Sequence, residues 1–364
     1  MTTLTSDPAV PRDAVPPRPR DRAVAGYKDL VALVQETGLM QRRRGFYAVR
    51  ISTTLLALAG IVTGVVLLGN SWWTLLLAGA LALVMTQGAF LGHDGAHRQI
   101  WASHRANEWT GRVFACLVAG LSYGWWMGKH NKHHQAPNQK GIDTDIESDV
   151  VSFHTEAAEG RRGLHAFLTR RQGWFFPPLL LLAGANLHVD SFRTLLGRKA
   201  PKRRFVDLAM MAVHWTLYVG FLLTFTSPAV TAAFVGVHLA VFGVSMGGAF
   251  APNHMGMPIV PKGVKANFLN RQVAMSRNIS GGFGIDLVMG GLNFQIEHHL
   301  FPSMPRPNLR KVQPIVAAFC AEHQIPYTQT TFFGAYRHII ADLNKVGLAA
   351  RNPFTCPLRA ELGR

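Results

Sequence analysis

Histidine is the residue type that could carry chemistry in this chain, because sixteen of its 364 residues are His. Eight of them gather in four short motifs. HDGAH contains His93 and His97, HNKHH contains His130, His133 and His134, APNHMG contains His254, and QIEHH contains Gln295, His298 and His299. Residues three or four apart lie on one face of a helix, so we expect each motif with several members to aim its side chains at one point.

Eight imidazoles and one carboxamide exceed the ligand shell of one metal ion and suit two ions with about four or five ligands each. Neutral imidazole favours zinc, copper, iron or nickel. Soluble di-iron bundles use Glu-x-x-His motifs, none of which occurs here, so a di-iron site in this chain must be rich in His. A lone pair such as HDGAH is more often a solvated polar face, and His254 by itself fits a histidine at a helix end. The metal hypothesis therefore depends on the whole set.

The elements that must position these motifs are four apolar stretches without Asp, Glu, Lys or Arg. Each is close to the length of about 20 residues that crosses a bilayer. They cover residues 51–69, 72–92, 208–226 and 229–250. Two residues join the members of each pair, and HDGAH and APNHMG directly follow the second and fourth stretches. We therefore expect an all-α integral membrane protein, with four spans in two transmembrane helical hairpins and a helical cytosolic cap carrying a His-rich di-metal site.

The distribution of charge predicts the orientation. The chain has 37 Lys and Arg against 20 Asp and Glu, a net charge of +17, and every basic residue lies outside the two hairpins. By the positive-inside rule, both termini, the segment between the hairpins and the His motifs are cytoplasmic. Topology thus accounts for the basic charge, and we expect no nucleic-acid partner. The three Cys residues are scattered, which excludes a disulfide framework and an iron–sulfur site.

The pattern divides the chain into three parts. Residues 1–45 form a cytosolic N-terminal tail, expected to be disordered to about residue 25, and no apolar core marks it as a signal peptide. Residues 46–350 form the membrane domain, and residues 351–364 form a C-terminal tail. Two shorter apolar stretches, 113–127 and 175–187, are too short to span comfortably and are expected to be interfacial or re-entrant.

The motifs HDGAH, HNKHHQAPN and GGLNFQIEHHLFPSMPRPNL together resemble the three histidine boxes of the membrane fatty acid desaturase family. The likeness runs from about Arg44 to Tyr336. It is nearest to the branch in which Gln opens the third box, as in front-end and related acyl-CoA desaturases. The resemblance implies a non-haem di-iron centre that uses O2 to remove two hydrogens from a long-chain fatty acyl group.

The resemblance also implies the iron ligands. Seven are the box histidines His93, His97, His130, His133, His134, His298 and His299. His254 matches an additional ligand that follows the last span in relatives, and Gln295 stands where many relatives have His. Four carboxylates lie beside these residues and are candidates to orient the imidazole rings: Asp94, Asp143, Asp145 and Glu297. Asp94 cannot share the face of His93 and His97, so its partner would be a neighbouring motif, and the alternative for Glu297 is that it only favours the helix.

Electrons for such a reaction come from outside the chain. The sequence has no His-Pro-Gly-Gly haem motif, no Gly-x-Gly-x-x-Gly and no cluster-binding Cys set. We therefore expect a separate ferredoxin, rubredoxin or cytochrome-type carrier with its reductase, which the basic charge would steer. An acyl-CoA substrate is favoured because Lys and Arg at the cytosolic mouth suit its phosphates, and an acyl-lipid substrate is the alternative.

Two other functions stay open at this point. A membrane hydroxylase or ketolase shares the histidine boxes, although QIEHHLFPSMPR argues against it. A His-rich metal transporter would place ionisable residues inside its spans, and these spans hold only His214 and His238, for which a buried hydrogen-bonded role is the default. The remaining six histidines are expected at the surface or around the ligands: His104, His154, His165, His188, His323 and His338.

Overall fold

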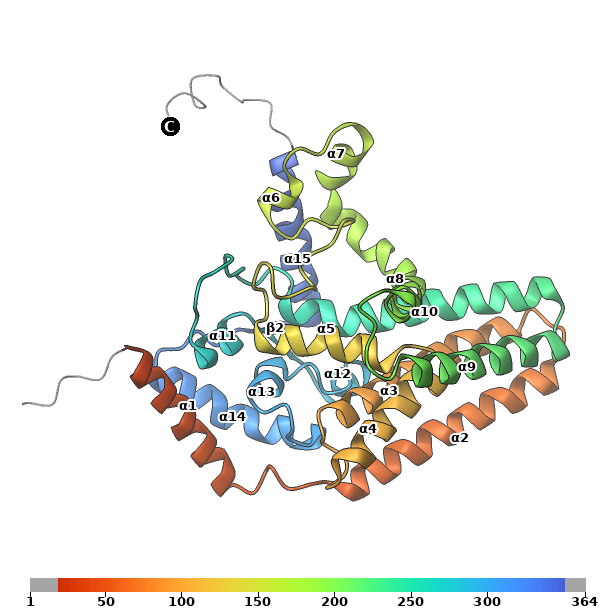
Figure 1. Cartoon of the computed structure of the whole chain (residues 1–364), viewed down its shortest axis with the longest axis horizontal. Coiled ribbons are helices and arrows are strands. Elements are labelled where there is room, and N and C mark those ends of the chain that lie inside the picture. Colours follow the sequence, from red (N-terminus) through yellow and green to blue (C-terminus); the bar gives the residue numbers. More distant parts are fainter. Residues whose placement is uncertain (1–18, 351–364) are drawn as a thin grey trace, which may run out of the picture.

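The computed structural model describes residues 19–350 (Figure 1). The C-terminal tail 351–364 and most of the stretch expected to be disordered lie outside the described residues. From Pro19 onward the chain is already helical, in α1 (Pro19–Glu36). The N-terminal tail therefore contributes a helix to the cap, where α1 packs against α11 and α14.

Within residues 19–350 the regular secondary structure is helical apart from one pair of short parallel strands, in which Asn278, Ile279 and Ser280 pair with Gln329, Thr330 and Thr331. After α1 the order is α2 (Arg44–Leu68), α3 (Thr74–Ala96), α4 (His104–Arg112), a π-helical segment (Val113–Val118), α5 (Tyr123–Gln135), α6 (Thr155–Ala158), α7 (Gly163–Thr169), α8 (Gln172–Leu196), α9 (Arg204–Phe225), α10 (Pro228–His254), α11 (Phe268–Ala274), β1 (Asn278–Ser280), α12 (Phe283–Val288), α13 (Gln295–Leu300), α14 (Arg306–Glu322), β2 (Gln329–Thr331), α15 (Phe332–Gly347) and a final 3-10 turn (Leu348–Ala350).

The four long apolar helices α2, α3, α9 and α10 are long enough to cross a membrane, with mean hydropathies of 2.2, 1.9, 1.6 and 1.9. They confirm the four spans and two hairpins expected from the sequence. Figure 1 shows the two hairpins extending together from one side of a compact helical cap. Ser227 caps the start of α10 by accepting the Val230 N–H, and Pro228 occupies its first turn, where a missing N–H costs nothing.

The second and fourth spans continue beyond their predicted ends. The sequence places those ends at residues 92 and 250, but α3 continues to Ala96 and α10 to His254. Hydropathy falls where the polar motif begins, whereas the backbone hydrogen bonds of the helix do not depend on it. As a result, His93 and His254 stand on the last turns of the membrane helices themselves.

The stretch 175–187 belongs to α8, which runs at a steep angle to the four spans in Figure 1. Its exposed face carries Trp174, Leu181 and Leu182, as an interfacial helix would. It crosses α10 where glycines allow the two backbones to meet. A Cβ on Gly243 would overlap the carbonyl oxygen of Leu180, and one on Gly184 would overlap that of Leu239. The crossing fixes α8 against the last span.

We predict that Gly243→Ala lowers the melting temperature of the detergent-solubilised protein by several degrees, because overpacking costs about 1–3 kcal/mol. Gly236→Ala is the matched control, since Gly236 lies on the same helix and a Cβ there meets no atom within 4 Å. Thermal unfolding of both variants measures the effect. Equal melting temperatures for the two variants would contradict the close crossing.

Candidate metal centre

The eight motif histidines converge in the cap next to the ends of α3 and α10. HDGAH comes from the end of α3, HNKHH from α5, His254 from the end of α10, and QIEHH from the six-residue helix α13. A buried apolar cluster packs beneath α13 and includes Ile296 and Leu300 of that helix, together with Leu30 of α1 and Val312 of α14. The apolar residues of α13 are therefore anchored in this cluster, while its His side chains point at the other three motifs.

Five of the histidines form what we call the first His set: His93, His97, His130, His134 and His298. One ring nitrogen from each lies within 4.8 Å of every other. The Nε2 atoms of His97 and His130 are 2.7 Å apart, and those of His134 and His298 are 3.1 Å apart.

The other three, His133, His254 and His299, form the second His set. The Nε2 atoms of His133 and His254 are 3.2 Å apart, and the Gln295 carboxamide nitrogen lies 2.9 Å from His254 Nε2. Stacked rings of His134 and His299, with centroids 4.3 Å apart, join the two sets. Gln295 thus lies at the second set, where its amide can present either its nitrogen or, after a flip, its oxygen.

The sequence expectation that each motif aims at one point is wrong for HNKHH and QIEHH. Adjacent residues on a helix point about 100° apart. His133 therefore faces the second set while His134 faces the first, and His298 and His299 divide in the same way. The adjacent pairs are what allow one helix to contribute to two sites.

The donor geometry fits a pair of metal ions. Two metal–nitrogen bonds of about 2.1 Å place their nitrogens about 3.0 Å apart at a right angle and about 4.2 Å apart in line. The His134–His298 and His133–His254 separations lie within this range, and the His97–His130 separation of 2.7 Å lies slightly below it. Within residues 26–350, the Nε2 atoms of His93 and His299 are buried without a hydrogen-bond partner. Buried polar atoms are normally satisfied, so these two indicate a missing partner that accepts nitrogen lone pairs.

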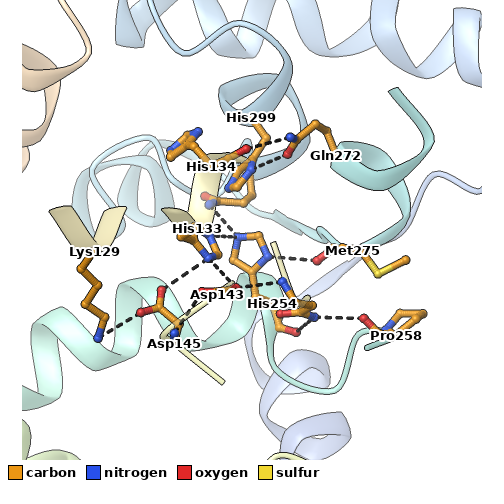
Figure 2. Close-up of polar contacts among 12 residues, drawn as sticks. Lys129, His133, His134, Asp143, Asp145, His254, Pro258, Gln272, Met275 and His299 are labelled. Atoms are coloured by element: carbon orange, nitrogen blue, oxygen red, sulfur yellow. Dashed lines mark hydrogen bonds and ion pairs between the residues drawn. The ribbon is translucent and has the colours of Figure 1, made fainter. Parts of the chain in front are cut away.

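Hydrogen bonds to the opposite ring nitrogens hold the second set in place (Figure 2). His254 Nδ1 donates to the Met275 carbonyl over 2.9 Å, and His299 Nδ1 donates to the Gln272 side chain over 2.8 Å. His133 Nδ1 donates to Asp143 over 2.9 Å. These bonds select the tautomer that leaves each Nε2 free to bind a metal.

The protonation states also suit metal binding. Burial, reinforced by neighbouring imidazoles, holds the pKa of His130, His134, His298 and His299 well below the usual value, so these rings are neutral. His133 differs from them. Burial lowers its pKa, but the hydrogen bond to Asp143 and the charges of Asp145 and Asp143 outweigh this and raise it.

The four carboxylates singled out in the sequence have different surroundings. Asp143 bonds to His133 and accepts the N–H of Asn138, and Asp145 lies 3.4 Å from His133 Nδ1 and 3.0 Å from Lys129 Nζ. Asp94 pairs with Arg306, and its other oxygen lies 3.5 Å from His93 Nδ1. Glu297 instead accepts bonds from Asn278 and Tyr327, and burial raises its pKa to about 7. It supports α13 without touching an imidazole ring.

Sequence reasoning missed Gln272. Its side-chain oxygen accepts from His299, and its amide donates to the His134 carbonyl, so it connects HNKHH with QIEHH. Gln272 lies 27 residues before His299 and belongs to no motif, so only the fold brings it there.

The histidines outside the motifs take no part in the two sets. His214 donates to the Leu117 carbonyl and His238 bonds to Tyr218, in agreement with the buried hydrogen-bonded role expected for both. The surface or ligand-neighbour expectation is wrong for His188. This ring is buried on α8, with its nitrogens 2.7 and 3.1 Å from the carbonyl oxygens of Gly184 and Ala119.

A cavity of about 350 Å³ opens between α5, α8 and α10 and reaches the two His sets. We call it the acyl cavity. Its walls are largely apolar and include Trp126, Phe176, Leu180, Met246 and Phe250. Three histidines of the two sets and the neighbouring Gln295 line its inner end: His130, His133, His254 and Gln295. An apolar chain inside it would run directly past both His sets.

Comparison with known proteins gives a consistent family. Residues 70–331 match the family model described as fatty acid desaturase. The chain is 30% identical over 347 residues to a Delta(8)-fatty-acid desaturase of Borago officinalis, covering 91% of this chain and 77% of that protein. It is 29% identical over 351 residues to an acyl-lipid (9-3)-desaturase of the same plant, covering 92% and 78%. A fatty acid desaturase 2-like protein of Mus musculus is 29% identical over 286 residues, covering 76% and 57%.

We predict that Asp143→Asn weakens metal binding about 10–100-fold, because the carboxylate that orients and polarises His133 is lost. The measurement is the metal-to-protein ratio during competition with a soluble chelator. Asp149→Asn, at an exposed position on the same loop, is the control with the same change of charge. Metal retention in Asp143→Asn equal to that of the control would refute the role of Asp143.

Proposed function

The chain belongs to the fatty acid desaturase family and is an integral membrane oxidoreductase, and from this premise we propose the finer points of its reaction. Two iron ions bind the two His sets, a long-chain acyl group occupies the acyl cavity, and a separate carrier supplies electrons. The observation that supports this most strongly is that eight imidazoles and the Gln295 carboxamide meet at the inner end of an apolar cavity.

The proposed ligands divide between the ions as the nitrogens do. The first His set serves one ion, and the second His set with Gln295 serves the other. A donor set of neutral imidazoles without a coordinating carboxylate suits iron among the metals that imidazole favours. When bound, iron supplies the O2-dependent oxidation that an unactivated methylene requires.

The proposed reaction removes one hydrogen from each of two adjacent CH2 groups and forms a C=C bond between their carbons. O2 takes up these two hydrogens together with two electrons from the carrier and two protons, and leaves as two water molecules. The chain's own part is to hold the acyl group still and dry. Trp126 stacks on His130 with ring centroids 4.2 Å apart and lines the acyl cavity, so it forms the wall between substrate and first set.

Two acyl donors are candidates. We propose acyl-CoA first, because the basic residues of the chain lie outside the spans and suit its phosphates. One observation favours an acyl-lipid instead. Among residues 26–350, Lys129 is the one Lys or Arg that lines the acyl cavity. Its ammonium group is already paired with Asp145. Two acyl-lipid (9-3)-desaturases also occur among the relatives.

We predict that His130→Ala, His134→Ala and His298→Ala each abolish unsaturated product while membrane insertion stays intact, because these residues lie beyond the spans. Product is measured by chromatography of fatty acid methyl esters from aerobic cells that supply electrons. The wild-type protein should retain close to two irons per chain.

His104→Ala, at an exposed histidine, is the control for the three His variants. Gln295→His should retain more activity than Gln295→Ala, and full activity in any of the three His variants would exclude the ligand assignment.

We predict that purified protein with NADPH, O2 and acyl substrate is inactive until a small redox carrier and its reductase are added. Parallel assays then offer acyl-CoA in detergent without phospholipid, or a labelled acyl chain within a phospholipid. Product from acyl-CoA alone supports the thioester. Product from the phospholipid alone identifies an acyl-lipid desaturase, and activity with NADPH but no carrier would refute the need for one.

We also propose that the cap and both termini face the cytoplasm, since all 37 basic residues flank the hairpins on that side. Reporters fused after Lys199 and Arg364 should then both report the cytoplasm. A signal from the outer side at Lys199 would be incompatible with this orientation.

A further inference from the structure

A second, smaller crevice lies between α2 and α3, at the end of these spans that meets the cap. It has a volume of about 100 Å³, more than the volume of about 30 Å³ that one water occupies in the liquid. It shares no lining residue with the acyl cavity. The residues that line it are Arg50, Thr53, Thr54, Ala57, Val84, Gln87, Leu91 and Arg306.

The crevice opens toward the bilayer. Arg50, Thr53 and Ala57 recur at helical spacing on one face of α2, and the last two are exposed. Between Thr53 and Ala57 on the same helix, Leu56 is 71% exposed, as expected for a side chain in contact with lipid. A molecule in the crevice would therefore have its polar end at Arg50 and its apolar part along α2.

Arg306 forms the inner wall of the crevice. Its side chain is 7% exposed, and Nη2 pairs with Asp94. Its backbone N–H donates to Tyr47 and Gln99 side-chain oxygens, which fixes the start of α14. Among residues 26–350, however, Arg306 Nε is buried without a hydrogen-bond partner. A buried guanidinium with a free N–H in a crevice is an unfilled position for an acceptor.

Arg50 adds a second cation that lacks a counter-charge. Within residues 26–350 no carboxylate forms an ion pair with Arg50, and its guanidinium lies over the Phe46 ring. The crevice thus holds two guanidinium groups against the single carboxylate of Asp94. A charge at a low-dielectric boundary is costly unless an opposite charge accompanies it.

We propose that the Arg50–Arg306 crevice binds the phosphate of an anionic membrane phospholipid. Guanidinium groups pair with phosphate oxygens through charge-assisted hydrogen bonds. Basic pockets between membrane helices are typical positions for anionic headgroups. The Thr53 hydroxyl and the exposed face of α2 accommodate the glycerol and acyl parts. The bound anion balances the one excess positive charge and accepts from Arg306 Nε, while Arg306 Nη2 stays paired with Asp94, which lies beside His93.

The test is the thermal stability of the purified full-length protein in dodecyl maltoside, titrated with phosphatidylglycerol or with phosphatidylcholine. We expect phosphatidylglycerol to raise the melting temperature to a plateau, and phosphatidylcholine to have little effect. In Arg50→Gln, half of the rise should require about tenfold more phosphatidylglycerol. Arg44→Gln is the matched control, because Arg44 is an exposed residue at the start of the same helix with the same charge. Arg44→Gln should show the same rise in melting temperature at the same phosphatidylglycerol concentrations as the wild type.

Arg50→Lys covers the case in which Arg50→Gln fails to fold. The phosphatidylglycerol concentration that gives half of the rise in its melting temperature should lie between the values for the wild type and Arg50→Gln, because Lys keeps the charge but lacks the planar donor pair. Equal weakening in Arg50→Gln and Arg44→Gln would overturn the site in favour of general surface attraction. An equal rise with phosphatidylcholine would overturn the requirement for net negative charge. If inorganic phosphate in detergent reproduces the full rise, the lipid is overturned as the source of the anion. This readout does not involve desaturase activity, so its failure leaves the proposed reaction untouched.

Discussion

The need to hold eight imidazoles neutral and convergent in one buried volume is the constraint on which the rest of the structure depends. Water would compete for the ring nitrogens, and protonation would remove their lone pairs, so the rings must be dry. Dry rings lose their hydration and need fixed partners instead, which the Met275 carbonyl, Gln272 and Asp143 supply. The helices of the cap enclose this buried volume. Its helices α11, α13 and α14 bury an apolar layer on one side of α13, and α1 covers that layer from outside.

The same constraint explains why two spans outlast their apolar sequence. A helix is a stiff rod, so a ligand on its last turn has a fixed height relative to the bilayer. His93 on α3 and His254 on α10 anchor the two His sets to the membrane helices, which pack against one another. Helix α8 crosses α10 at Gly184 and Gly243 and lines the acyl cavity from the other side. In the proposed function, one helix, α10, therefore helps to fix both the acyl cavity and the second His set.

The sequence was sufficient for the features that depend on local pattern. Apolar runs predicted the four spans, and i, i+3 and i+4 spacing predicted helical His motifs. It was insufficient where the outcome depends on how distant elements meet. The 100° step of a helix points His133 and His134 in different directions, but the sequence does not show that α5 lies between two sites and so supplies one residue to each. Gln272 belongs to no motif, and its partners His134 and His299 are remote in sequence. Arg306 lies in the third motif's extension, but nothing in that motif shows that it pairs with Asp94. His188 was misjudged because a single polar residue in an apolar helix does not reveal which carbonyl group it will meet.

The two His sets are unequal, and their inequality matches their positions relative to the acyl cavity. The first set has five imidazoles and exposes one of them, His130, to the acyl cavity, whereas the second has three imidazoles and a carboxamide, with His133, His254 and Gln295 all at the cavity wall. A catalytic metal site keeps a position open toward its substrate, while a site closed by protein ligands does not. The set with fewer strong donors is thus the one that contributes more residues to the wall of the acyl cavity, as the proposed reaction requires. The weak donor Gln295 occupies the place where a further imidazole would close the shell, and the carboxylates Asp143 and Asp145 lie behind His133, on the side away from its metal-facing nitrogen. The third-box glutamine therefore leaves the cavity-facing set less completely closed than a histidine would.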